Sequence, residues 1–115
     1  MGFYDDYIPM PTIDCPTCGM PFAGWQGKDG PCAFFVWRQG DKAPVDQPIA
    51  DECRLPLEDL QRVRLPRAFA IYPHGCQCSA VWAAIGETDG DERWSVTRIV
   101  TSDEARAFAD PFSNT

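Results

Sequence analysis

The sequence predicts a small β-rich (α+β) domain, built from an antiparallel sheet of roughly four to six strands with one or two short helices. The chain has 115 residues, the size of one ordinary domain, and 44% of them are hydrophobic. Eleven Pro and nine Gly favour short strands and turns over long helices. Two cysteine pairs with metal-type spacing predict a zinc-ribbon-like knuckle. We therefore treat residues 1–115 as a single zinc-ribbon-like domain.

The first half of the chain predicts an arm, a hairpin and a loop. Residues 1–14 are polar and aromatic, with two Pro, and predict an extended arm. Residues 20–26 and the aromatic run 32–37 predict two strands, and the turn signal at 28–30 joins them in a hairpin. Residues 39–52 contain several acids, two Pro and one Gly without a clear period, and they predict a surface loop.

The middle of the chain predicts a helix followed by two strands. Residues 56–63 begin with Pro and carry acids in the first turn, where the helix dipole favours them. Residues 69–72 are β-type and lead towards the second cysteine pair, and residues 79–85 form the next apolar run.

An Asp-Gly dipeptide then predicts a hairpin turn, followed by a strand over residues 93–100. The last predicted element is a helix over 103–109, with Ser102 or Asp103 as its N-cap. Residues 110–115 are expected to form a frayed tail.

The four paired cysteines are the predicted metal ligands. In Cys15-Pro-Thr-Cys18-Gly19, two sulfurs three residues apart on a turn can both reach one Zn²⁺ at ~2.3 Å. Cys76 and Cys78 would share one face of a strand, which permits chelation where the backbone bends. The 57 residues between the pairs must then form the domain itself. Four thiolates leave no open position on the metal, which indicates a structural site.

The other thiols and the histidine leave alternatives open. His74, the only histidine, lies two residues before Cys76 and could replace one thiolate. Some of the paired cysteines could instead be buried small hydrophobes. Cys32 is interpreted as a buried thiol, and Cys53 as the more reactive one. A disulfide between Cys32 and Cys53 is disfavoured in a reducing cytosol.

No catalytic motif is present: the sequence has no phosphate-binding glycine loop, no G-x-S-x-G and no H-E-x-x-H. We therefore expect no catalytic residues and no cofactor other than Zn²⁺. A thiol or redox enzyme using Cys53 is the weakest alternative.

The formal charge of −7 argues against general nucleic-acid binding and favours another protein as partner. Two clusters keep alternatives open. The first is an arginine cluster that could contact nucleic acid. Its members are Arg54, Arg62, Arg64 and Arg67. An acidic hairpin tip could solubilise the turn or contact a basic partner, and it consists of Glu87, Asp89, Asp91 and Glu92. The acidic surface of the whole chain could also mimic DNA.

Several segments together carry a family resemblance. They are the opening Met-Gly-Phe-Tyr-Asp, the Cys-Pro-Thr-Cys-Gly knuckle, the segment Trp25-Gln-Gly-Lys-Asp-Gly30 and the late cysteine pair. This set resembles small uncharacterised zinc-ribbon proteins of bacteria and their phages. The resemblance implies zinc binding alone, and the chain departs from the pattern with C-x-C in place of a second C-x₂-C. Frequent Pro, Ala, Asp and Arg with few Lys indicate a high-GC genome, such as that of an actinobacterium or its phage.

The start of the chain shows no secretory signal, since acids stand where such a signal carries bases. No apolar run approaches the ~20 residues that span a bilayer. We therefore expect a cytoplasmic protein with no membrane association.

Overall fold

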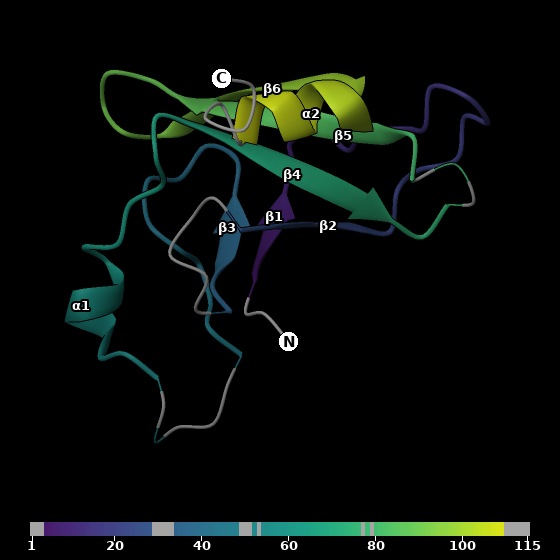
Figure 1. The fold of residues 1–115 in the computed structure, drawn as a ribbon. Coiled ribbons are helices and arrows are strands. Elements are labelled where there is room, and N and C mark those ends of the chain that lie inside the picture. Colours follow the sequence, from purple (N-terminus) through teal and green to yellow (C-terminus); the bar gives the residue numbers. More distant parts are fainter. Residues whose placement is uncertain are drawn as a thin grey trace.

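The protein is described by a computed structural model, which covers residues 4–28, 34–48, 52, 54–76, 78 and 80–109. Six strands and two short helices occur there (Figure 1), and the strands form one sheet in the order β3-β1-β2-β4-β5-β6. The elements are β1 (Asp5–Ile8), β2 (Gly24–Gly27), β3 (Val36–Arg38), α1 (Leu57–Leu60), β4 (Ala68–His74), β5 (Trp82–Thr88), β6 (Trp94–Thr101) and α2 (Ser102–Ala109). The predicted small β-rich domain is confirmed.

The sheet is mixed, so the prediction of a purely antiparallel sheet is wrong. β1 pairs with β3 in parallel and with β2 antiparallel. The predicted hairpin between residues 20–26 and 32–37 is also wrong, because β1 lies between the two strands. Residues 5–8 of the predicted arm supply that strand. A parallel neighbour needs a long connection, so no local turn signal could reveal it.

The curled sheet brings the segment after β3 against the start of β6. The backbone N–H of Gly40 donates to the carbonyl oxygen of Trp94 at 2.7 Å, and the N–H of Trp94 donates to the carbonyl oxygen of Asp41 at 3.2 Å. The side-chain amide of Gln39 donates to the carbonyl oxygen of Ser95 at 3.0 Å. These hydrogen bonds join the two ends of the sheet around one aromatic core.

The main core fills the concave side of this sheet. The indole of Trp94 meets the rings of Tyr7 and Phe69 edge to face, with centroids 5.8 and 5.4 Å apart, an arrangement that aromatic quadrupoles favour. Trp25 and Trp37 are buried in the same core. Three of the four tryptophans therefore stabilise the fold by burial.

α2 covers part of the opposite face, where it packs against β4, β5 and β6. Its contact surface is built from small and branched side chains, namely Ala70, Ala83, Ile85, Val100 and Ala105. The hydroxyl of Thr101 accepts a hydrogen bond from the N–H of Glu104 at 3.2 Å. Thr101 thus performs the capping that we expected of Ser102 or Asp103, because the helix already begins at Ser102.

One predicted region is described in part and another lies outside the described residues. Residues 39–48 of the expected loop 39–52 contain an isolated bridge between Asp46 and Val36 and no helix or strand. The expected tail 110–115 lies outside the described residues.

The carboxylate of Asp5 is buried and ties β1 to β3. Its Oδ1 accepts the backbone N–H of Phe35 at 3.1 Å, and its Oδ2 accepts the indole N–H of Trp37 at 3.2 Å. We expect Asp5→Ala to lower the free energy of unfolding by ~2–5 kcal/mol, because it leaves two buried donors without this acceptor. Urea unfolding measures the loss. In the same assay the exposed-site control Asp103→Ala should shift stability by less than ~0.5 kcal/mol, and equal losses for both variants would contradict the prediction.

Candidate metal centre

The two predicted cysteine pairs come together in space. The sulfur atoms of Cys15, Cys18, Cys76 and Cys78 all lie within 4.8 Å of one another. The Sγ atoms of Cys18 and Cys76, 58 positions apart in sequence, are separated by 3.3 Å. Four sulfurs at this spacing could hold one metal ion.

The first pair lies on a tight turn. The backbone N–H of Gly19 donates to the carbonyl oxygen of Cys15 at 2.9 Å, and the N–H of Cys15 donates to the carbonyl oxygen of Met20 at 2.8 Å. Gly19 has φ +77°, a conformation that glycine adopts without steric cost. An isolated bridge between Asp14 and Pro21 closes the base of the turn. Local backbone geometry therefore holds Cys15 and Cys18 on one tight turn, as the spacing predicted.

The second pair follows a sharp bend at the end of β4. Gly75 has φ +93°, and a Cβ placed there would lie 2.3 Å from the Cβ of Ala23. Beyond the bend, the N–H of Cys78 donates to the sulfur of Cys76 at 3.3 Å. This bend is what lets a C-x-C pair point both sulfurs at one position. We had not singled out Gly75, although a glycine directly before the pair was a visible signal.

Strand pairing explains why the knuckles meet. β2 follows the first knuckle, β4 precedes the second, and these strands are antiparallel neighbours with Gly24 opposite His74. The indole N–H of Trp82, at the start of β5, also donates to the hydroxyl oxygen of Thr17 inside the first knuckle at 2.9 Å. Both knuckles are therefore anchored to the same end of the sheet.

The thiols of the cluster differ in acidity. Burial raises the pKa of Cys15, but hydrogen bonds from the backbone of Cys18 and Thr17 and from the Cys18 and Cys76 thiols outweigh it and lower this pKa to about 7. The backbone of Cys78 lowers the pKa of Cys76, but the Cys18 thiol, burial and the remaining thiols together raise it to about 12.

Burial followed by the Cys15 thiol raises the pKa of Cys78 as well. A metal must therefore displace protons from these sulfurs on binding.

The remaining predicted ligands and thiols lie elsewhere. Among the residues that the structure describes, the cluster of candidate ligands comprises the four cysteines and does not include His74. The imidazole of His74 lies over Gly24 instead, so the geometry does not favour exchange of a cysteine for this histidine. Cys32 and Cys53 lie outside the described residues.

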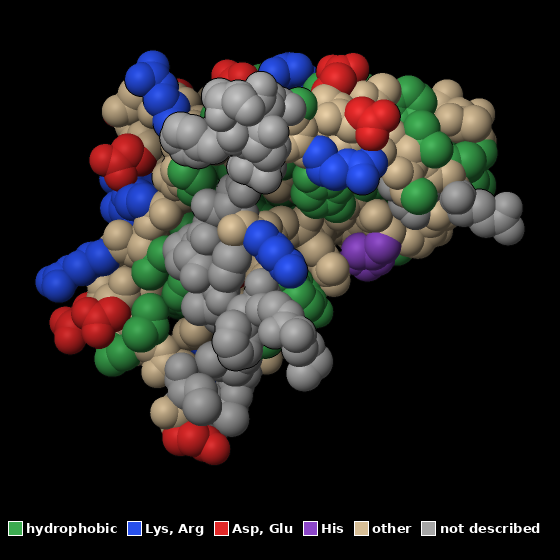
Figure 2. Space-filling model, viewed as in Figure 1, with side chains coloured by type: hydrophobic (Ala, Val, Ile, Leu, Met, Phe, Trp, Pro, Cys, Tyr) green, Lys and Arg blue, Asp and Glu red, His purple; other side chains and the backbone are tan. Residues whose placement is uncertain are grey.

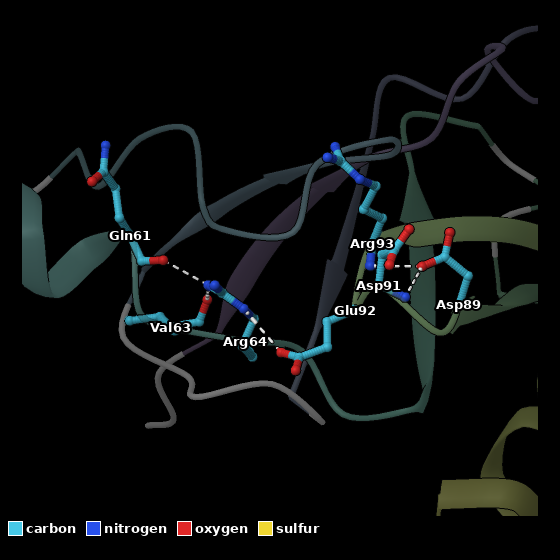
Figure 3. Close-up of polar contacts among 7 residues, drawn as sticks. All are labelled: Gln61, Val63, Arg64, Asp89, Asp91, Glu92 and Arg93. Carbon is cyan, nitrogen blue, oxygen red and sulfur yellow. Dashed lines mark hydrogen bonds and ion pairs between the residues drawn. The ribbon is translucent and has the colours of Figure 1, made fainter.

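Two of the four residues of the arginine cluster make ion pairs within the chain. The guanidinium of Arg64 pairs with the carboxylate of Glu92 at 3.0 Å and donates to the carbonyl oxygens of Gln61 and Val63 (Figure 3). Arg54 pairs with Asp46 at 3.6 Å. These ion pairs count against a phosphate-binding surface here.

The acidic hairpin tip also has a structural role. One carboxylate oxygen of Asp89 accepts the backbone N–H groups of Asp91 and Arg93 at 2.9 and 3.1 Å (Figure 3). Glu92 pairs with Arg64 and so joins the tip to the segment after α1. Two of its four acids thus stabilise the turn and its contact with the body of the protein.

The chain matches no protein-family model, no curated protein and no solved structure. Neither α1 nor α2, the two helices in the described parts of the chain, is long and apolar enough to cross a membrane.

Substitution at the bend should damage the second knuckle. We expect Gly75→Ala to lower the free energy of unfolding by ~2–4 kcal/mol, because an alanine would be strained at positive φ and would overlap Ala23. Zinc affinity measured by competition with a chromogenic chelator should fall in the same variant. Gly90→Ala is the matched control, since nothing lies within 4 Å of a Cβ placed there. A Gly75→Ala protein as stable as the Gly90→Ala protein would contradict this account.

Proposed function

We propose that the protein is a non-enzymatic zinc-binding accessory protein, in which one structural Zn²⁺ joins the two cysteine knuckles. The observation that carries this proposal is the convergence of the four sulfur atoms within 4.8 Å. Zinc bound by thiolates is tetrahedral with Zn–S distances of ~2.3 Å, which requires sulfurs separated by ~3.8 Å. The spacing of the cluster fits one such ion.

The donor set determines the class of site. Four soft thiolate ligands suit Zn²⁺ or iron, and they exclude the hard cations that prefer oxygen. Four protein ligands also complete the tetrahedral shell, so no position remains for a substrate or an activated water. The metal then stabilises the fold, and the protein functions through the partner that its surface binds.

The surface favours a protein partner. The chain carries 17 acidic and 10 basic side chains, and acidic and basic side chains are interspersed on the face seen in Figure 2. A small acidic domain of this kind suits an immunity, inhibitor or phage accessory role, in which it binds a basic partner. Complementary charge speeds such association and makes it sensitive to salt.

Elemental analysis of the purified protein tests the metal. We expect about one zinc per chain, and iron in its place would retain the structural site but reject zinc. Thiol titration on the same sample should find the four paired cysteines protected while metal is bound. A metal-free protein with all six cysteines reactive would contradict the proposal.

Affinity capture from lysate tests the accessory role. The zinc-loaded protein should retain a specific partner at low salt and release it as salt rises, since exposed charge pairs are screened within a Debye length of ~10 Å at 0.1 M. A chemically unfolded sample of the same chain is the control for non-specific retention. Failure to retain any partner beyond that control would count against the role but leave the metal site intact.

A further inference from the structure

Polar side chains form a row across three strands on the face that carries α2. The pairing register places Asp6 opposite Gln26, and Gln26 opposite Tyr72. Their sequence neighbours Tyr7, Trp25 and Ile71 belong to the main core on the other face. Because side chains alternate along a strand, the row points away from that core. The row thus lies on the face of the sheet opposite the main core.

A hollow lies over this row. A cavity of about 430 Å³ is lined by Tyr4, Gln26, Lys28, Tyr72 and His74, a volume within the ~300–1,000 Å³ of small-molecule sites. The small residues Gly27 and Ala70 form part of its floor. Histidine and basic side chains are visible on this face in Figure 2. The cavity is separate from the cysteine cluster, and none of the four cysteines lines it.

One glycine determines where the imidazole lies. A Cβ at Gly24 would be 2.6 Å from Nε2 of His74 and 2.8 Å from its Cε1. The edge of the ring therefore lies against Gly24, and His74, an exposed residue, forms part of the cavity wall. Any larger residue at position 24 would move it.

The groups around the cavity differ in charge and hydrogen bonding. Lys28 supplies a cation to the lining, and the Gln26 amide offers both a donor pair and an acceptor. Asp6 lies beside Gln26 in the same row but does not line the cavity, and burial raises the pKa of its carboxyl. Tyr4 and Tyr72 add aromatic surface. A cation, a hydrogen-bonding edge and aromatic surface thus meet in one cavity.

We propose that this cavity binds a small heteroaromatic anion of the nucleoside monophosphate class. The flat ring would lie against the tyrosines, its polar edge would meet Gln26, and the anionic group would meet Lys28. Aromatic side chains on a sheet surface commonly stack heterocyclic bases in this way. The site goes beyond the proposed zinc function and does not depend on it.

Titration of the ¹⁵N-labelled full-length zinc-loaded protein with AMP, GMP, CMP and UMP, followed by NMR, tests this site. We expect at least one nucleotide to shift the amide signals of residues 24–28 and 68–74 with a Kd of ~1 mM or below. Two control compounds each lack one part of the nucleotide. Adenosine lacks the anionic phosphate, and phenyl phosphate lacks the polar heterocycle. Each should bind at least about tenfold more weakly than the best nucleotide.

Two variants separate the site from general charge attraction. Lys28→Ala should weaken nucleotide binding about tenfold and leave adenosine binding unchanged, whereas Lys42→Ala, a matched exposed lysine, should change neither. The unperturbed spectrum of each variant verifies its fold, and zinc content is measured on the same samples. No shifts at ~10 mM nucleotide, equal loss in both variants, or equal binding of phenyl phosphate would overturn the proposal.

Discussion

Removal of the metal by a strong chelator is expected to lower the free energy of unfolding by more than ~4 kcal/mol. The reason is that the four cysteines connect the beginning of the described chain to the loop between β4 and β5, across 58 positions of sequence. Without the ion, the four sulfurs, which lie within 4.8 Å of one another, are no longer joined through a shared metal. Urea unfolding monitored by tryptophan fluorescence measures the effect, with zinc content determined in parallel.

Substitution of a ligand provides the matched test. Cys76→Ser should abolish stoichiometric zinc binding and reproduce the loss of stability seen with the chelator. Cys53→Ser, which alters a cysteine outside the two pairs, should retain zinc and the parent stability. If the chelated protein and Cys76→Ser both unfold at the parent urea midpoint, the ion does not stabilise the fold and the structural site is wrong.

Truncation of Trp94 is expected to cost ~3–5 kcal/mol of stability. Its side chain is fully buried, and its ring contacts Tyr7 and Phe69 edge to face. Its indole N–H also donates to the hydroxyl oxygen of Thr97 at 2.7 Å. Trp94→Ala therefore removes one of the three buried indole rings of the core and leaves a cavity in its place.

Two further variants divide that loss into its parts. Trp94→Phe keeps most of the ring but loses the hydrogen bond, so we expect a smaller loss of ~1–3 kcal/mol. Arg98→Ala, on the same strand but exposed, should shift stability by less than ~0.5 kcal/mol. Urea unfolding of the three variants should rank them in this order. A Trp94→Ala protein no less stable than Arg98→Ala would contradict the assigned core.

Local signals predicted much of the second half of the fold. The Asp-Gly turn and the strand predicted at 93–100 correspond to the turn between β5 and β6 and to β6 itself, within one residue. The helix predicted at 103–109 begins one residue earlier, and the strand predicted at 79–85 lies three residues later, at 82–88. Hairpins and short helices are encoded by neighbouring residues, which explains this agreement.

The four candidate ligands could also be identified from the sequence. Cys15, Cys18, Cys76 and Cys78 were identified by spacing alone, and the structure places all four in one cluster. The choice between Cys and His74 could not be made in this way, because it depends on a contact between neighbouring strands. The imidazole of His74 lies against Gly24 on the neighbouring strand β2, and not among the sulfurs.

The sequence by itself therefore determined the β-rich class, the hairpin of β5 and β6, the short helices and the two cysteine pairs, each of which is encoded by residues close in the chain. Only the tertiary structure decided that β1 lies between β2 and β3, that the curled sheet joins Gly40 to Trp94, and that Asp6, Gln26 and Tyr72 form one row. Parallel pairing, curl and register arise from contacts distant in sequence, whose free energy appears only once the whole sheet has formed.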